Sequence, residues 1–145
     1  MKIFEEKMEN LNYINIPSVY SVILNDAKDK VLTVRNGKGH YFLPGGGLEE
    51  NESHEEGIER EMLEETGYNI SINSYIGKAK MYFTSSNKEP LLNDGHFYSV
   101  KLLDKICEPI EDDHIMHWIP IDSVKDYLFH KHHIWAVNKY VNVMY

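Results

Sequence analysis

The sequence predicts an α/β fold in a single domain that covers residues 1–145. Segments rich in β-branched and aromatic residues dominate the first two thirds of the chain, and segments with helix-capping signals or helical periodicity lie beside and after them. The chain has 145 residues, of which 42% are apolar, and this is enough for one ordinary core and too little for two independent ones. The sequence contains no internal repeat or low-complexity tract that would mark a second domain.

The first two expected strands are residues 13–24 and 30–35, both rich in Val, Ile, Leu or Tyr. The polar residues 25–29 between them predict a turn, so the simplest interpretation is a hairpin. A short extended piece at 41–43 then leads through Pro44 into the three glycines 45–47. Glycine adopts backbone conformations that other residues resist, so we expect a sharp turn there or a close approach to the backbone.

A helix is predicted to begin at Ser53. Ser53 and Glu56, three residues later, form a capping-box pattern. Gly67, which follows Thr66, stands where a left-handed C-terminal cap is expected.

Two more strands are expected at 69–85 and 96–103, separated by a loop at 87–95, although their alternation is imperfect. The apolar run 115–121 predicts a further strand. The tail predicts helices at about 123–129 and 133–143.

The second tail helix carries an apolar stripe that favours packing into the core, at Ile134, Val137 and Val141. The chain ends in three apolar residues, Val143, Met144 and Tyr145, and a homodimer would be a natural way to cover them.

Composition disfavours several classes of protein. No run approaches the roughly 18 apolar residues of a membrane span, and the first twelve residues lack the apolar segment of a secretory signal. Cys107 is the only cysteine, which excludes an intrachain disulfide and a multi-cysteine metal site. We therefore expect a cytoplasmic protein with no membrane partner, in which Cys107 is a small, buried or half-buried side chain.

The net charge of −8 is concentrated in one segment. Residues 49–65 hold nine glutamates and one arginine, Arg60. An acidic body repels phosphate backbones, which disfavours nucleic acid as a partner and makes divalent cations the first partner to consider.

On a helix, Glu61, Glu64 and Glu65 fall within a sector of about 100°, with Gly57 leaving a gap one turn earlier. Carboxylates that crowd together resist ionisation as they are desolvated, unless a cation neutralises them. Ligand sets made only of oxygen suit Mg²⁺ or Mn²⁺. The alternative is an ordinary solvated acidic face.

The spacing of these residues is specific. Residues 46–68 fit the pattern G-x5-E-x7-R-E-U-x-E-E-x-G-U, where U is a bulky apolar residue. The fixed positions are Gly46, Glu52, Arg60, Glu61, Glu64, Glu65 and Gly67. This segment resembles the Nudix box, and residues 42–46 are similar to the family's usual approach to it. The last position, Tyr68, is aromatic where the family has an aliphatic residue.

The resemblance implies a Nudix-type α/β/α sandwich on a mixed β-sheet. It implies hydrolysis of a nucleoside diphosphate linked to another group, with Mg²⁺ or Mn²⁺ as cofactor. The implied metal ligands are Glu61, Glu64, Glu65 and the main-chain carbonyl of Gly45 or Gly46.

The resemblance also suggests supporting roles. Arg60 stands four residues from both Glu56 and Glu64, so we expect it to hold the carboxylates in place. Glu52 is expected either to brace the loop or to act on water. Many relatives supply a further acid from a later loop, for which Asp112 is our first choice and Glu111 the second. The alternative for both is a solvated loop acid.

The substrate is the least specified feature. The broadest expectation is a nucleoside triphosphate or a related nucleotide, including an oxidised one. Arg35 and Lys38 lie near the glycines, where they would contact phosphates or simply face solvent. Two alternatives stay open: a Nudix-fold module that binds a nucleotide without cleaving it, and an RNA 5′-pyrophosphohydrolase, which the acidic surface disfavours.

Histidines form two further groups. His130, His132 and His133 lie close together near the end of the chain, and His114 and His117 are three residues apart. Zinc binding is one interpretation, but neither group has the additional ligands of a known tetrahedral pattern. We therefore expect surface or interface histidines.

Overall fold

The computed structural model describes residues 2–110 and 113–144. Its elements in chain order are β1 (Lys2–Phe4), β2 (Ile14–Val22), β3 (Lys30–Arg35), β4 (Tyr41–Phe42), β5 (Gly45–Gly47), α1 (His54–Glu65), β6 (Tyr68–Thr84), β7 (Pro90–Lys105), β8 (Ile115–Pro120), a 3-10 turn (Ile121–Ser123), α2 (Val124–Tyr127) and α3 (Lys131–Met144).

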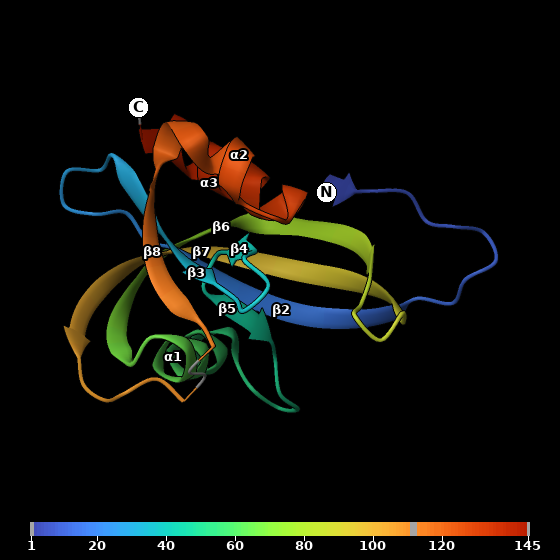
Figure 1. Ribbon diagram of the computed structural model, residues 1–145, viewed down its shortest axis with the longest axis horizontal. Coiled ribbons are helices and arrows are strands. Elements are labelled where there is room, and N and C mark those ends of the chain that lie inside the picture. The colour runs from blue at the N-terminus through green and yellow to red at the C-terminus, as the bar shows by residue number, and fades with distance from the viewer. Residues whose placement is uncertain (1, 111–112, 145) are drawn as a thin grey trace.

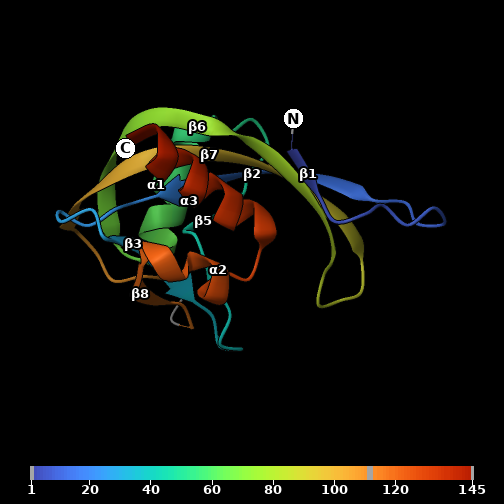
Figure 2. The same ribbon diagram turned by 90° about the horizontal axis from the view of Figure 1, so that it is seen from above.

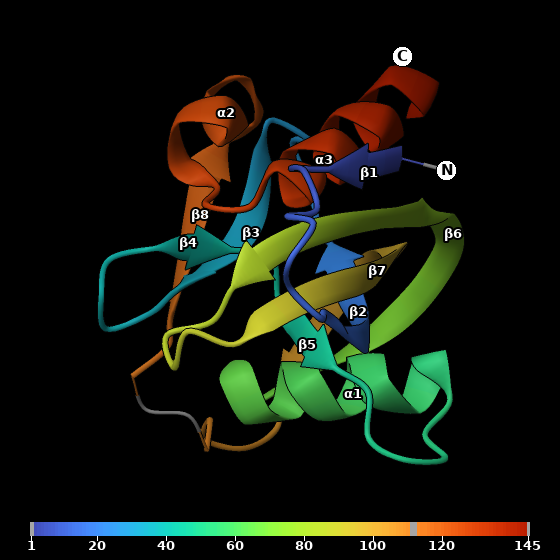
Figure 3. The same cartoon turned by 90° about the vertical axis from the view of Figure 1, so that its right-hand side faces the viewer.

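The strands form two sheets between layers of helices (Figure 1). The larger sheet has the order β1-β6-β7-β2-β5, and the smaller has the order β4-β3-β8. The β1–β6 and β2–β7 pairs are parallel, whereas β6–β7 and β2–β5 are antiparallel. Helix α1 lies on one side of the strands and α2 and α3 on the other, as Figures 1 and 3 show. The predicted α/β/α sandwich on a mixed sheet is confirmed.

The expected hairpin of β2 and β3 is wrong beyond its turn. The Asn25 N–H donates to the Lys30 carbonyl, and Leu24 bridges Val31, so the chain does reverse direction there. Beyond this point β2 pairs with β5 and β7, and β3 pairs with β4 and β8. The two strands therefore separate beyond the turn, because β2 belongs to the larger sheet and β3 to the smaller one.

The longest strands, β6 and β7, form a hairpin that curves along the larger sheet (Figure 2). The expected loop at 87–95 is too long, because residues 90–95 belong to β7. Asn93 and Asp94 look like loop residues but are buried, and the Asn93 amide donates to the Tyr20 hydroxyl at 2.9 Å. Strand β1, which was not predicted, adds a three-residue parallel edge to β6.

Helix α1 has the ends that the sequence predicts. Ser53 accepts a hydrogen bond from the Glu56 N–H, and the Glu56 carboxylate accepts one from the Ser53 N–H. Gly67 has a φ of +77°, the left-handed conformation that stops the helix. Ile58 and Met62 bury the apolar side of α1 against the larger sheet.

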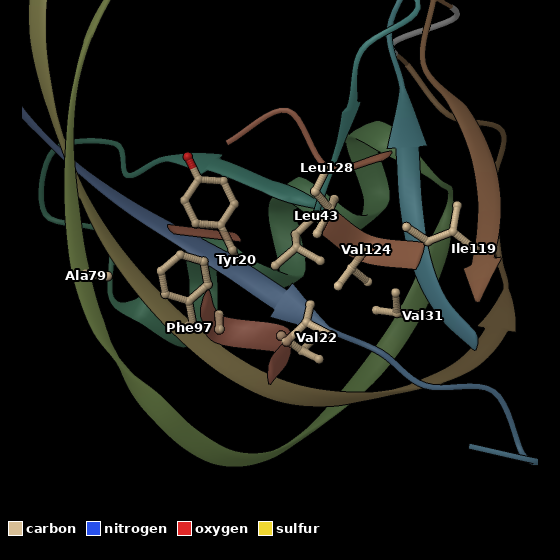
Figure 4. Packing of buried hydrophobic residues seen from close by; sticks show 11 residues of the cluster. Tyr20, Val22, Val31, Leu43, Ala79, Phe97, Ile119, Val124 and Leu128 are labelled. Carbon is tan, nitrogen blue, oxygen red and sulfur yellow. The ribbon is translucent and has the colours of Figure 1, made fainter. Parts of the chain in front are cut away.

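The core has two parts, one on each side of the larger sheet. The part beneath α1 contains Val19 and Val100 with the apolar face of that helix. The part beneath α2 and α3 surrounds Tyr20 and Phe97, whose rings stack at 5.3 Å between centroids (Figure 4). The predicted apolar stripe of α3 packs here: Val137 is fully buried and its two companions in the stripe are partly buried.

Two expectations about single residues are wrong. His132 and His133, expected at the surface or an interface, are fully buried. They lie in the first turn of α3, and their rings pack against those of Tyr20 and Phe97. Cys107 is exposed, because it lies in the irregular connection after β7 and not in a strand.

None of the described helices is both long enough and apolar enough to cross a membrane.

Candidate active site

A segment rich in glycine lies in space between β2 and α1. We call residues 43–47 the glycine strap. Its last three residues form β5, which pairs antiparallel with β2 so that Gly45 lies opposite Tyr20 and Gly46 opposite Val19. Gly45 has a φ of +147°, and a Cβ there would lie 2.1 Å from the Val19 carbonyl oxygen. Only glycine fits at this position, so the expected close approach to the backbone is confirmed.

The strap lies against the acidic face of α1. The Gly45 N–H donates to Glu65 Oε1 at 2.8 Å. A Cβ on Gly46 would stand 2.8 Å from Glu61 Oε1, so the missing side chain leaves room beside that carboxylate. Both glutamates are buried, at 5% and 9% exposure, although most glutamates are solvated. Helical register and the glycines together therefore bring these two carboxylates to one place.

Arg60 ties the acids together. Its Nη1 donates to Glu61 Oε1 at 3.0 Å and to Glu64 Oε2 at 3.2 Å. Its Nε donates to Glu52 Oε2 at 2.6 Å, and its Nη2 donates to Glu52 Oε1 at 2.9 Å and to the Gly47 carbonyl at 3.0 Å. One guanidinium thus links the strap, the loop before α1 and two acids of the helix face.

The pair of Arg60 and Glu52 has fixed charges. Hydrogen bonds from Arg60 lower the pKa of the Glu52 carboxyl to about 2. The same contact raises the pKa of Arg60 above its ordinary value. Both groups are therefore ionised at neutral pH.

Arg60 does not contact Glu56, which was its other expected neighbour. The Glu56 carboxylate turns back to the helix start, where hydrogen bonds from Ser53 lower its pKa. Capping takes this acid away from the site.

The donors at this place suit a hard divalent cation. Every side chain is a carboxylate, and carboxylate oxygens are preferred ligands of Mg²⁺ and Mn²⁺. Within residues 2–110 and 113–144, no group of three or more His, Cys, Asp or Glu side chains is already arranged around one point as a metal site. In this arrangement the Arg60 guanidinium shares one nitrogen between Glu61 and Glu64. The oxygen donors and the space beside Gly46 fit such an ion.

Some expected site residues lie elsewhere. Arg35 stacks on Tyr41 with its guanidinium 5.9 Å from the ring centroid, and the Lys38 N–H donates to Asn36 within the same β3–β4 turn. The structure therefore does not join Arg35 or Lys38 to the acids. Asp112 and Glu111 lie outside the described residues.

Sequence reasoning missed a buried layer behind the strap. The Tyr20 ring lies directly beneath Gly45, where its Cδ1 would be 2.6 Å from an added Cβ. Burial raises the pKa of Tyr20 to about 12, and the charges of Glu65 and Glu61 also favour the neutral phenol. Strand alternation indicates that Tyr20 points inward, but no local signal shows that it underlies the strap.

Comparison with known proteins agrees with this arrangement. The family model described as NUDIX domain matches residues 15–138, which is most of the chain. The chain belongs to the Nudix family. Members of this family are pyrophosphatases that hydrolyse phosphoanhydride bonds.

Individual relatives support the same assignment. This Nudix chain is 40% identical over 58 residues to a protein of Bacillus subtilis (strain 168) provisionally named as an 8-oxo-dGTP diphosphatase, and the match covers 40% of our chain and 39% of that protein. A NUDIX hydrolase from Nitrosomonas europaea superposes with a TM-score of 0.71 at 22% identity, over 90% of both chains. A MutT protein from Methanosarcina mazei Go1 superposes with a TM-score of 0.68 at 20% identity, over 93% of this chain and 99% of that one. The two structural matches show a shared fold.

Proposed function

We propose that this protein hydrolyses a phosphoanhydride bond in a nucleoside di- or triphosphate or a related nucleotide, with Mg²⁺ or Mn²⁺ as cofactor. The observation that carries the proposal is the gathering of buried carboxylates at the glycine strap. Glu61 and Glu65 are buried there, and Arg60 ties Glu61 to Glu64.

The charge of the site explains the need for a cation. Five acids gather at this site with the single guanidinium of Arg60, which leaves a formal charge of −4: Glu49, Glu52, Glu61, Glu64 and Glu65. A polyphosphate does not approach such a surface unprotected, because like charges repel more strongly where water is excluded. Bound divalent ions reverse this repulsion.

The residues that would hold the ion are Glu61, Glu64, Glu65 and a carbonyl of Gly45 or Gly46. When bound there, the ion neutralises phosphate oxygens and lowers the pKa of a coordinated water. The protein itself orients the donors. Arg60 sets the positions of Glu61 and Glu64, and the Gly45 N–H orients Glu65.

Glu52 serves in this proposal as the brace for Arg60. Its carboxylate accepts both the Nε and the Nη2 bonds of the guanidinium, and its Oε1 also accepts the Glu49 N–H at 2.9 Å. With both oxygens engaged, Glu52 is better placed to hold the loop than to take a proton from water. Of the two roles that the sequence leaves open for Glu52, we therefore propose the bracing role.

Oxidised nucleoside triphosphates are the first substrates to test. The Bacillus subtilis relative is named for 8-oxo-dGTP, and its matched segment has 40% identity with this chain. The panel therefore includes 8-oxo-dGTP, the ordinary nucleoside triphosphates, ADP-ribose, a sugar nucleotide and a dinucleoside polyphosphate. Products are followed by chromatography, with and without Mg²⁺ or Mn²⁺, because these are the ions that the carboxylate ligands prefer.

Variants of α1 test whether Glu64 and Glu65 belong to the active site. We expect Glu64→Gln and Glu65→Gln each to lower kcat by about 10²-fold or more, because each removes a charge that stabilises the reaction electrostatically. Glu59→Gln is the matched control, since it removes one charge from an exposed position of the same helix. Circular dichroism establishes that all three variants are folded.

The outcomes separate the two main hypotheses. Metal-dependent turnover that falls in the site variants and not in the control supports hydrolysis at this site. Near-normal turnover in Glu64→Gln and Glu65→Gln overturns the assignment. Tight nucleotide binding by the wild type without cleavage of any compound overturns the enzymatic proposal in favour of a binding module.

A further inference from the structure

We propose that His133 is a positioning residue, which holds the glycine strap in register with the acids of α1 through one buried hydrogen bond. This inference rests on the proposed function for its effect on catalysis. Its structural part is independent of any substrate.

The strap is anchored by one hydrogen bond at each of its first three residues. The Leu43 N–H donates to His133 Nδ1 at 3.2 Å. The Pro44 carbonyl accepts from the Ser21 N–H at 2.9 Å, and the Gly45 N–H donates to Glu65 at 2.8 Å. The anchors come from α3, β2 and α1, so His133 is the contribution of the C-terminal helix to the site.

The bond from Leu43 fixes the chemical state of His133. Nδ1 accepts a hydrogen bond, so it carries no proton, and in a neutral ring the proton is on Nε2. Burial and the neighbouring histidines lower the pKa of His133 well below its ordinary value, which keeps the ring neutral. A neutral ring is required because a protonated Nδ1 would become a donor and could not accept from Leu43.

The rest of the environment does not explain why this residue is polar. His133 is fully buried, its ring lies 4.4 Å from that of Tyr20 between centroids, and Phe42 and Phe97 also lie beside it. Among the described residues, Nε2 has no hydrogen-bond partner. A leucine would fill such a place without desolvating a polar group. The contact with Leu43 is therefore the feature that distinguishes histidine from an apolar side chain here.

His132 has a different task, although it is adjacent and equally buried. Its Nε2 bonds to Asn93 Oδ1 at 2.9 Å, and the Asn93 amide donates to the Tyr20 hydroxyl. This network supports the ring beneath Gly45 and has no direct hydrogen bond to the strap. The two histidines thus brace the strap from behind by separate routes.

Three substitutions in the 145-residue chain test the role of His133 Nδ1. His133→Asn keeps an acceptor close to the position of Nδ1, His133→Gln carries its acceptor one bond farther out, and His133→Leu has none. Val137→Ala is the matched control, because it removes fully buried volume from the same helix and the same core cluster but no hydrogen bond to the strap. This variant shows how far a loss of stability alone changes the measurements below.

The first measurement is amide hydrogen exchange of Leu43 and Gly45 by NMR, which needs no substrate. We expect exchange at both residues to accelerate about tenfold or more in His133→Leu and His133→Gln, as one net hydrogen bond is lost. His133→Asn is expected to stay within about threefold of the wild type. Unchanged exchange in His133→Gln, or equal acceleration in Val137→Ala, would overturn the positioning role. If His133→Leu does not fold, the exchange rates of His133→Asn and His133→Gln alone test the positioning role.

The second measurement is the Mg²⁺ concentration that gives half-maximal hydrolysis. We expect it to rise about tenfold in His133→Gln and to be restored by His133→Asn, because a displaced strap presents its carbonyls poorly to the ion. An unchanged Mg²⁺ dependence in His133→Gln overturns the link to catalysis. Absence of hydrolysis by the wild type overturns the proposed function alone, since the exchange measurement still tests the strap.

Discussion

The pair of Arg60 and Glu52 offers the sharpest test of what holds the acidic site together. Its two hydrogen bonds, at 2.6 and 2.9 Å, are bidentate, and the side chains are only 21% and 10% exposed. Hydrogen bonds to charged groups contribute about 1.5 to 3 kcal/mol each where water is largely excluded. Because partial exposure weakens both, we expect a coupling free energy of about 2 to 4 kcal/mol.

The pKa of Glu52 gives a second route to the same magnitude. A fall from 4.5 to about 2 corresponds to roughly 3 kcal/mol of stabilisation of the ionised carboxyl in the folded state. The sign follows from the lowered pKa: this stabilisation is complete above pH 4.5 and is lost as the pH falls toward 2. Thus the stability difference between the wild type and Glu52→Ala is expected to shrink over that interval.

The assay is a double-mutant cycle in urea at pH 7, with the wild type, Arg60→Ala, Glu52→Ala and the double variant. The cycle cancels the other contacts of Arg60 and leaves the pairwise term. The exposed pair of Lys105 and Glu108 provides the control cycle, since its side chains are 47% and 86% exposed and its expected coupling is below about 0.5 kcal/mol. A coupling at Arg60 as small as that of the control would refute the reasoning.

Three further predictions concern the rest of the fold. Ser53→Ala removes the capping box of α1 and is expected to lower the free energy of unfolding by about 1 kcal/mol, measured by thermal melting; no change would mean that the cap is replaced by water. Gly67→Ala places a Cβ 2.0 Å from the Cys107 carbonyl oxygen at a φ of +77°, so we expect a loss of about 2 kcal/mol or more in urea, and a neutral result would contradict the geometry. Burial lowers the pKa of His130 to about 4 and that of His132 to about 3. Between these values and pH 6.5, the two histidines are therefore protonated in the unfolded chain and neutral in the folded chain. Stability is therefore expected to fall as the pH drops from 6.5 toward 4, with a flatter slope in His130→Asn, and an unchanged slope in that variant would contradict the assignment.

The sequence predicts the parts of the fold that depend on short-range pattern. Strand β3 matches its expected range, and both ends of α1 match because capping residues act on neighbouring backbone groups. Strand pairing is different, because it depends on segments far along the chain. The turn after β2 therefore suggested a hairpin, whereas β2 finds its long partner in β7.

The same division applies to the candidate site. Helical periodicity is enough to predict that Glu61, Glu64 and Glu65 share one face, and in the structure Glu61 and Glu65 lie beside the glycines. The buried support was not predictable. His133 reaches Leu43 across 90 positions of sequence, and from local pattern alone its histidine cluster resembles a surface feature.

Strand β2 has a consequence for the order in which the molecule assembles. Residue 14 pairs with residue 91, so the central parallel ladder begins to close only after the chain has been synthesised 77 positions beyond residue 14. Ladders between such distant segments form slowly, since the entropy of closing the loop is lost before the contacts are gained. Until then, the edge of β2 that pairs with β7 has no strand of this chain beside it and is open to other chains. We therefore expect the nascent protein to be prone to aggregation until β7 has been synthesised.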